Sequence, residues 1–461
     1  MKIPVFFLLL YGVFLFAACQ PTSETTQPHE PTSLIPVESA TAPLETSAAF
    51  TPDPQTISTP TPELWNTDLL FHMHGDSFSP AISSDGRFVV FVSRSGDLIE
   101  KGNNHCVGYG GISYNCSDIF LYDLQIGTLR LVSIGLNNQS ANGNSYSPTI
   151  SSDGRWIAFV SEATNLSANR MGTAALFLYD SQNEHLELIA PAAMEPSISA
   201  DGRIVVYSRD STPRNIYLYD RYTGINELIS QAWNGQGANG DSIASQISAD
   251  RRFVAFWSWA GNLIPDDTEN CRENETYNYS CGDVFIFDRE TSQMERIPIG
   301  ETYGLGMGNY SLSLSANGDL LAFNCQIYDR KKSQVIYEQN CGKLSEDGQL
   351  VVFQQGADYF INELETGLIS QVSIASDGTP SNGEWVDFEI TFEGESFRPG
   401  FGMSKDAQWV VFSSTASNFF GEDNQVCDDV FFKPHNCYDI YVHNRETGLT
   451  DWISKPLEIQ R

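Results

Sequence analysis

The chain has 461 residues, of which 26 are Lys or Arg and 58 are Asp or Glu, so its formal net charge is −32. A surface this acidic repels phosphate backbones, which argues against nucleic acid as a partner. Cationic ligands and divalent ions are compatible with it, and the charge also keeps an exported domain soluble. Residues 65–461 carry 25 basic and 52 acidic side chains, a net charge of −27, so the acidity belongs to the predicted folded region.

The chain begins with a secretory signal pattern. Lys2 precedes an apolar run over residues 3–16, and two small residues separate that run from Cys19. The run is shorter than the roughly 20 residues of a membrane-spanning helix, but it suits a cleaved signal peptide. The segment Phe16-Ala17-Ala18-Cys19 resembles the lipobox of bacterial lipoproteins, although that family usually has leucine in place of the phenylalanine. The resemblance implies a lipoprotein signal peptide over residues 1–18, lipidation of Cys19 and an extracytoplasmic, lipid-anchored protein of the cell envelope.

Residues 19–64 are predicted to be the lipidated cysteine followed by a disordered tether. Of the 43 residues from 20 to 62, 24 are Pro, Thr or Ser and none is Lys or Arg. Such a segment has too little apolar surface to offset the chain entropy lost on folding, and its prolines favour extended conformations. We expect the tether to hold the following domain away from the membrane surface.

From residue 77 onward one pattern returns seven times. The first copy contains Ser79-Pro80-Ala81-Ile82-Ser83-Ser84-Asp85-Gly86, and Ser147-Pro148-Thr149-Ile150-Ser151-Ser152-Asp153-Gly154 is nearly the same string. The acidic or amide residue of the repeated turn stands at seven positions: Asp85, Asp153, Asp201, Asp250, Asn317, Asp347 and Asp406. Internal repeats with intervals of this size are typical of solenoids, propellers and arrays.

Each repeat contains the strands of a propeller blade. A strand that ends in serine runs into an Asp-Gly turn, which supplies the positive φ of a tight hairpin. The apolar run that follows, such as residues 88–92, does not alternate with polar residues and therefore predicts a strand buried on both faces. Third and fourth strands follow, for example over residues 215–220 and 226–230. Four antiparallel strands per repeat predict an all-β fold, a β-propeller over residues 65–461.

The repeats resemble the TolB-like, PD40 (WD40-like) propeller repeat, whose signature S-P-x-x-S-x-D-G is nearly intact in the first three copies. The resemblance covers about residues 66–455 and implies four-stranded blades arranged in a ring. Later copies depart from the signature: Arg251 and Ala407 replace the glycine, and Asn317 replaces the aspartate. We predict seven blades. Six stay open as an alternative, because the fifth repeat is compressed to 30 residues and could merge with the sixth.

Eight cysteines follow Cys19, and their spacing predicts disulfides. Three pairs are ten residues apart, each between the second and third strands of a blade: Cys106/Cys116, Cys271/Cys281 and Cys427/Cys437. Metal sites favour CxxC spacing or clustered histidines, which these segments lack, and an exported compartment favours disulfides. Cys325 and Cys341 are the remaining pair.

In a four-stranded meander, all eight of these cysteines lie on one side of the ring, together with the long loops rich in asparagine and glycine. Functional residues concentrate in elaborated loops on a rigid scaffold, so we expect this side to be the binding face. Neutral drift of the loops, with cysteines that only repair long insertions, is the alternative.

Two acidic clusters in the cysteine-containing insertions are candidate calcium ligands, since Ca²⁺ prefers oxygen donors. They comprise Asp266, Asp267 and Glu269 in one insertion, and Glu422 and Asp423 in another. Neither fits EF-hand spacing, so solvated acidic loops are the preferred interpretation and no other cofactor is indicated. No HExxH or G-x-S-x-G motif is present in the chain, and we assign no catalytic residue.

These observations predict a monomeric binding scaffold for a protein, peptide or glycan of the cell envelope. The alternative is an extracytoplasmic hydrolase or lyase with its site in the propeller channel, so whether the chain is an enzyme stays open. Inner strands rich in Ser, Ala and Ile favour binding. Clustered carboxylates or a histidine on those strands would favour catalysis, as in paired-carboxylate glycosidases.

Overall fold

The structure is a computed structural model that describes residues 75–457 with thirteen gaps. The gaps are residues 101–104, 108–112, 169–172, 266–269, 275–276, 281, 298–311, 339–341, 385–389, 393–394, 398–399, 422–425 and 428–434. For residues 107 and 113 and for the strands within 270–280 and 390–397, only the backbone is described. All described residues belong to the second of two units, Leu64–Arg461. The signal segment, Cys19 and the tether lie outside them and stay predictions.

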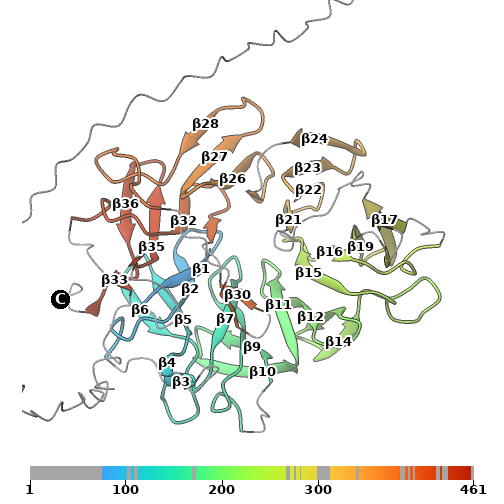
Figure 1. Ribbon diagram of the computed structural model, residues 1–461, viewed down its shortest axis with the longest axis horizontal. Coiled ribbons are helices and arrows are strands. Elements are labelled where there is room, and N and C mark those ends of the chain that lie inside the picture. The colour runs from blue at the N-terminus through green and yellow to red at the C-terminus, as the bar shows by residue number, and fades with distance from the viewer. Residues whose placement is uncertain are drawn as a thin grey trace, which may run out of the picture. The chain divides into compact units, whose positions relative to one another are not determined.

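Seven four-stranded antiparallel sheets follow one another along the chain, and each is one blade of a propeller (Figure 1). We number the blades 1 to 7 in chain order. The first strands pack at the inside of the ring: β1 (Ser77–Ile82), β7 (Ser145–Ile150), β11 (Ala193–Ile198), β15 (Ser242–Ile247), β21 (Leu312–Leu314), β25 (Gly342–Leu344) and β31 (Phe401–Met403). The second strands are β2 (Phe88–Ser93), β8 (Trp156–Ser161), β12 (Ile204–Arg209), β16 (Phe253–Ser258), β22 (Leu320–Phe323), β26 (Leu350–Gln355) and β32 (Trp409–Ser414).

The outer half of each blade consists of the third and fourth strands. The third strands are β5 (Asp118–Asp123), β9 (Ala175–Asp180), β13 (Asn215–Asp220), β19 (Asp283–Asp288), β23 (Gln326–Asp329), β27 (Asp358–Glu363) and β35 (Asp439–Asn444). The fourth strands are β6 (Thr128–Leu131), β10 (His185–Pro191), β14 (Ile225–Leu228), β20 (Gln293–Ile297), β24 (Gln334–Glu338), β28 (Ile369–Gln371) and β36 (Leu449–Trp452). In the described part of the chain, no helix has the length and apolarity to cross a membrane.

The prediction of seven blades is confirmed, and the six-blade alternative is wrong. Blade 5 is complete because its second and third strands are joined by a turn of only two residues, Asn324 and Cys325. Both residues have positive φ, 46° and 59°, as the tight hairpin turns that match strand twist require. A short repeat can therefore hold all four strands.

Among the described residues, apolar packing is divided into seven clusters, one at each interface between neighbouring blades. In β2, Val89, Val90, Phe91 and Val92 are all fully buried. This confirms the prediction from the non-alternating apolar run, because a sheet packed between two others buries both of its faces. The smallest cluster lies between blades 5 and 6 and contains four buried residues: Ala322, Ile327, Leu344 and Val351.

The ring closes without exchange of a strand. Blade 1 contains only β1, β2, β5 and β6, and blade 7 contains only β31, β32, β35 and β36. The chain crosses the other six interfaces, but the seam between blades 7 and 1 joins the two ends of the described region by packing and hydrogen bonds alone. One of these bonds runs from the Ser77 amide to the Tyr438 carbonyl over 2.7 Å. Contacts at this seam therefore carry the closure of the ring.

The glycine of the repeated turn also makes room for the preceding blade. Gly202 has a φ of 66°, and a Cβ added there would lie 2.3 Å from Cδ1 of Trp156. Gly86 and Gly154 have the same relation to Trp409 and Phe88. The turn thus requires glycine both for its backbone conformation and for the aromatic ring packed against it.

The two blades that lack this glycine show how the requirement is relaxed. Arg251 and Ala407 adopt φ values of 70° and 50° at the same position of the turn. In the blade before each of them, the second strand begins with an aliphatic residue, Ile204 or Leu350. In the blades that precede Gly86, Gly154 and Gly202, the same position is aromatic. Leu350 packs against the cluster that contains Ala407. A side chain is tolerated where no ring occupies the space.

Candidate binding face

The turns between first and second strands lie on one side of the ring, which we call the turn face, and they bond one another across blades. Backbone amides of Ser84 and Lys405 bond the carbonyls of Ser152 and Ser84 over 3.1 and 3.0 Å, which links blades 1, 2 and 7. The Ser84 hydroxyl also donates to the Glu346 carboxylate, which belongs to blade 6. Inward-facing polar groups of these turns are therefore used to hold the ring together.

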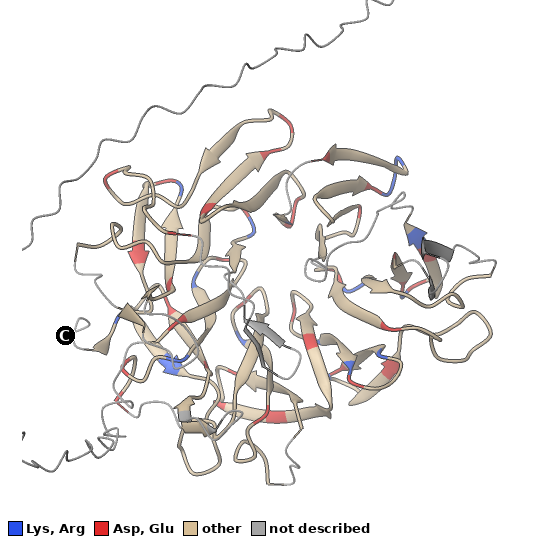
Figure 2. Ribbon diagram, viewed as in Figure 1, with Lys and Arg blue, Asp and Glu red and all other residues tan. Residues whose placement is uncertain are grey.

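Four arginines on the turn face are each paired within their own blade, whereas Arg251 pairs with Asp201 of the preceding blade. Four blades repeat one ion pair, with N···O distances of 2.6–2.8 Å: Arg87–Asp123, Arg155–Asp180, Arg203–Asp220 and Arg252–Asp288. The arginine partner holds the pKa of Asp180 and of Asp288 down to about 2. Acidic positions are spread over many blades of this acidic ring, and basic ones are fewer (Figure 2). The paired arginines serve blade structure rather than an anionic ligand.

Loops from second to third strand, and from fourth strand to the next blade, lie on the opposite side of the ring. We call it the stapled face, because the described disulfides are there. Cys106–Cys116 and Cys427–Cys437 are both formed, as predicted, with Cα–Cα distances of 5.0 and 4.9 Å. Cys325 is disulfide-bonded too. Cys341 and Cys281 lie outside the described residues, so the Cys271–Cys281 bridge stays a prediction.

The described insertions form short hairpins. In blade 1, β3 (His105–Val107) pairs with β4 (Ser113–Asn115), and in blade 7, β33 (Val426–Cys427) pairs with β34 (His435–Asn436). Backbone hairpins also form from β17 (Asn270–Asn274) with β18 (Tyr277–Ser280), and from β29 (Ile390–Phe392) with β30 (Glu395–Phe397). The calcium candidates Asp266, Asp267, Glu269, Glu422 and Asp423 lie outside the described residues and stay predictions.

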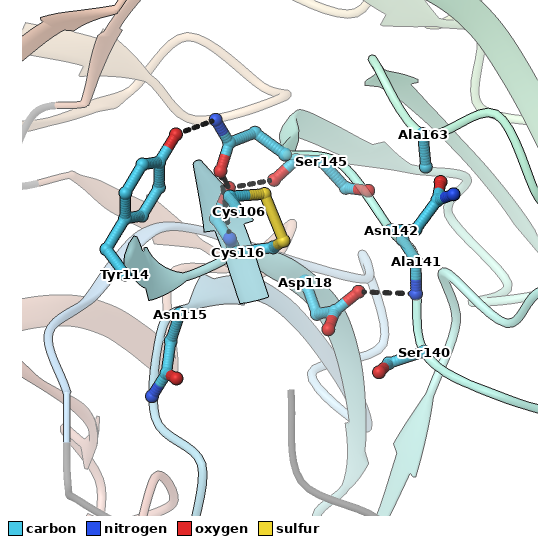
Figure 3. Close-up of a disulfide and its surroundings, with 12 residues drawn as sticks. Cys106, Tyr114, Asn115, Cys116, Asp118, Ser140, Ala141, Asn142, Ser145 and Ala163 are labelled. Carbon is cyan, nitrogen blue, oxygen red and sulfur yellow. Dashed lines mark hydrogen bonds between the residues drawn. A yellow bond between two sulfur atoms is a disulfide. The ribbon is translucent and has the colours of Figure 1, made fainter. Parts of the chain in front are cut away.

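The blade 1 hairpin grips blade 2. Asn144, just before β7, donates from its side-chain amide to the Tyr114 hydroxyl over 3.1 Å and accepts the Ser117 amide N–H over 3.1 Å (Figure 3). The interior of this insertion therefore contacts a neighbouring blade. Tyr114 therefore bonds across the interface to the next blade.

The blade 7 hairpin grips blade 1 in the same way. Asp76, just before β1, accepts the Tyr438 amide N–H over 2.8 Å, and its Oδ1 lies 3.2 Å from Nε2 of His435. Asp76 and His435 thus occupy the places that Asn144 and Tyr114 occupy one blade further on. Asp76 is buried and His435 is largely buried, with side-chain exposures of 2% and 10%. Each of these two hairpins therefore bonds to the blade that follows it around the ring.

A set of asparagine pairs holds the loops between blades, and the sequence interpretation missed it. Asn142, Asn239 and Asn382 each donate a backbone N–H, over 3.0–3.1 Å, to the side-chain oxygen of an asparagine in the next blade. The acceptors are Asn165, Asn262 and Asn418. Two repeated dipeptides could have indicated these pairs. Asn-Gly occurs in each of the three loops, and Asn-Leu or Asn-Phe follows the second strand of the next blade. These bonds fix long loops that would otherwise be free to move.

Two of these loops present an exposed apolar side chain at the same position. Leu136 and Trp233 are 65% and 64% exposed, and the N–H of each bonds the carbonyl of the paired asparagine, Asn165 or Asn262, over 2.9 and 3.3 Å. A large exposed apolar side chain on a loop fixed in this way is a candidate contact for a ligand, because little ordering is needed on binding.

A buried carboxyl group lies beneath one of the loops. Asp118 accepts the Ser133 hydroxyl over 2.5 Å. It also accepts the Ala141 amide N–H over 3.3 Å (Figure 3). Burial raises the pKa of Asp118 to about 8. In blade 3 the same position is Asn215, which accepts Ser230 and Ala238. The role of this position is therefore to hold the loop, since an uncharged residue also fills it.

Replacement of Asp118 by asparagine is expected to stabilise the protein near pH 7.5 more than near pH 5. Because the folded-state pKa is raised, the stability linked to the protonated carboxyl is present below about pH 4 and is lost as the pH rises toward 8. Asparagine does not titrate, so this loss disappears. Denaturant unfolding at the two pH values measures the difference, and an equal effect at both would contradict the prediction.

Polar groups on the inner strands are used to join blades. Glu195 accepts the Ala244 amide N–H over 2.7 Å, and Lys343 donates to the Phe401 carbonyl over 2.8 Å. On the outer strands of blade 7, His443 bonds Thr450 of the same blade over 2.9 Å, and burial lowers the pKa of His443 to about 4. Within the described residues these groups have structural partners. Only one cluster there could hold a metal ion, and it comprises Asp76, Cys427 and His435.

No model of a protein family matches the chain, and no curated protein matches it. Similar solved structures include the β-propeller domain of the Trilobed protease from Pyrococcus furiosus, at 12% identity and TM-score 0.47, covering 83% of this chain and 99% of that one. Oligogalacturonate lyase from Vibrio parahaemolyticus is another, at 13% identity and TM-score 0.46, and the match covers 80% of this chain and 89% of the lyase. TolB from Acinetobacter baumannii matches at 16% identity and TM-score 0.36, over 72% of this chain and 75% of TolB. The propeller assignment rests on the chain's own seven sheets.

Proposed function

We propose that the chain is a lipid-anchored, extracytoplasmic propeller that binds a protein, peptide or glycan of the cell envelope through its stapled face. The observation that carries this proposal is the difference between the two sides of the ring. Turns on the turn face are tied to one another and to paired arginines. Disulfides and asparagine pairs on the stapled face instead hold long loops that present exposed side chains, which is how rigid scaffolds carry binding residues.

The exposed anchors support binding rather than catalysis. Trp233 resembles the aromatic contacts that dominate binding energy at interfaces, and Leu136 is the apolar side chain at the equivalent position of another loop. A hydrolase or lyase in the channel has less support, because Glu195 and Lys343 are engaged with neighbouring blades. Two disulfides of the stapled face fit an oxidising compartment, which agrees with the proposed export.

Replacement of Cys19 by serine should remove the lipid anchor and release the protein from the membrane fraction. The reason is chemical, since lipidation requires the cysteine thiol. Fractionation of cells that express the wild type or the variant measures the change. If the variant stays in the membrane fraction like the wild type, the lipobox interpretation is wrong.

Replacement of Trp233 by alanine, together with Gly/Ser segments of equal length at residues 108–112 and 428–434, should weaken ligand capture roughly tenfold or more. Tyr114 and His435 are kept, because they clamp neighbouring blades. Capture from envelope extract by the Leu64–Arg461 unit, before and after the change, is the measurement.

Ile126→Ala and Tyr222→Ala are matched controls on the turn face, since those side chains are 63% and 67% exposed. Both should capture the ligand normally. If the turn-face variants lose capture while the stapled-face variant retains it, the binding face has been assigned to the wrong side.

A further inference from the structure

The seam between blades 7 and 1 brings four metal-ligating side chains together. Donor atoms of Asp76, Cys427 and His435 all lie within 4.8 Å of one another. Cys437 adds a fourth, because its sulfur is bonded to that of Cys427. Both cysteines are almost fully buried, at 2% and 3% exposure. Three of the four residues come from blade 7 and Asp76 comes from blade 1.

The arrangement has the dimensions of a tetrahedral site. Zn²⁺ binds nitrogen and oxygen at about 2.0 Å and thiolate sulfur at about 2.3 Å, so the nitrogen and oxygen of a tetrahedron lie about 3.3 Å apart. Nε2 of His435 and Oδ1 of Asp76 are 3.2 Å apart. The Tyr438 N–H donates to the same carboxylate over 2.8 Å and would orient it, as partners of a metal ligand commonly do.

We propose that reduction of Cys427–Cys437 converts this cluster into a Zn²⁺ site of two thiolates, one imidazole and one carboxylate. A dithiol reductant supplies two electrons and two protons and becomes a disulfide, while the Cys427–Cys437 bond breaks to give two thiols. Zn²⁺ then replaces the two thiol protons, which are released. The oxidised protein closes the seam with a stapled hairpin, and the reduced protein closes it with a metal that bonds both blades.

Blade 1 provides a natural control for this assignment. Its disulfide, Cys106–Cys116, has the same spacing and nearly the same Cα–Cα distance. In place of His435 and Asp76, however, it has Tyr114 and Asn144, which hydrogen-bond each other. Neutral tyrosine and asparagine are poor Zn²⁺ ligands, so reduction of this pair should create no comparable site.

Co²⁺, which takes the same tetrahedral geometry as Zn²⁺ and absorbs visible light, is the probe. The protein is reduced with a phosphine, freed of reductant under anaerobic conditions and titrated. We expect one Co²⁺ per chain with the charge-transfer absorption of a thiolate complex, and none before reduction. Cys427→Ser with Cys437→Ser should abolish it, whereas Cys106→Ser with Cys116→Ser should keep it. Absence of the band in the reduced wild type, or the reverse order of the two variants, would overturn the proposal.

Single-ligand variants separate metal binding from folding. His435→Gln should weaken Co²⁺ affinity by at least about tenfold, since even partners of metal ligands have effects of that size. Circular dichroism of the same samples checks the fold. Conversely, Tyr114→His with Asn144→Asp should give blade 1 the same four donors and raise the stoichiometry to two Co²⁺ per reduced chain. A stoichiometry that stays at one would contradict the assigned ligand set.

Discussion

Replacement of Asp76 by alanine is expected to lower the free energy of unfolding by about 2–4 kcal/mol, the range for breaking a buried polar network. Asp76 is buried and accepts both the Tyr438 amide N–H and the His435 side chain. Alanine leaves the amide donor buried without its acceptor. The effect should be large because the chain does not cross the seam that these bonds close. Denaturant unfolding of the oxidised protein measures it.

Asp76→Asn is the matched control for this prediction. Asparagine keeps an acceptor for the Tyr438 N–H, as Asn144 does for the Ser117 N–H one blade further on, so its effect should stay below about 1 kcal/mol. If alanine and asparagine destabilise the protein equally, the negative charge rather than the hydrogen bond matters at this position. If neither has an effect, Asp76 does not contribute to closure of the ring.

Replacement of Gly202 by alanine is expected to destabilise the protein by about 3 kcal/mol. A left-handed conformation costs a residue with a Cβ about 1–2 kcal/mol, and overpacking against Trp156 adds at least about 1 kcal/mol. The second contribution should disappear when Trp156 is changed to leucine in the same chain, because Leu350 already stands before Ala407 in blades 6 and 7. Unfolding of the two single variants and the double variant forms the cycle that measures this coupling.

Ala407→Gly tests the same rule in the opposite direction. Its φ of 50° suits glycine, and no aromatic ring needs the space, so we expect a change within about 1 kcal/mol. Strictly additive effects of Gly202→Ala and Trp156→Leu would show that the ring and the glycine are not coupled, and the explanation of the repeated turn would then have to be abandoned.

Blade architecture was predictable from the chain because its signals are local. A tight turn needs positive φ, and a strand buried on both faces needs an uninterrupted apolar run such as residues 88–92. Both features recur in each repeat within about ten residues of one another. The ten-residue spacing of Cys106 and Cys116 likewise predicted a bridge within one insertion. Each of these inferences depends on neighbours in sequence, whose geometry is limited by short chain length.

Only the tertiary structure decided how one blade holds the next. His435 and Asp76 are 359 residues apart, and no local pattern relates them before the ring is closed. From the sequence, Asn142 is only a turn residue, and the structure shows that it bonds Asn165 of the next blade. From the sequence, Arg251 is only a substitution of the turn glycine, and the structure shows an aliphatic residue, Ile204, at the matching position of the preceding blade. Such pairs form where two blades meet, so which residues become partners depends on how whole sheets pack against each other. The sequence alone determined the blades, and the seams between them required the fold.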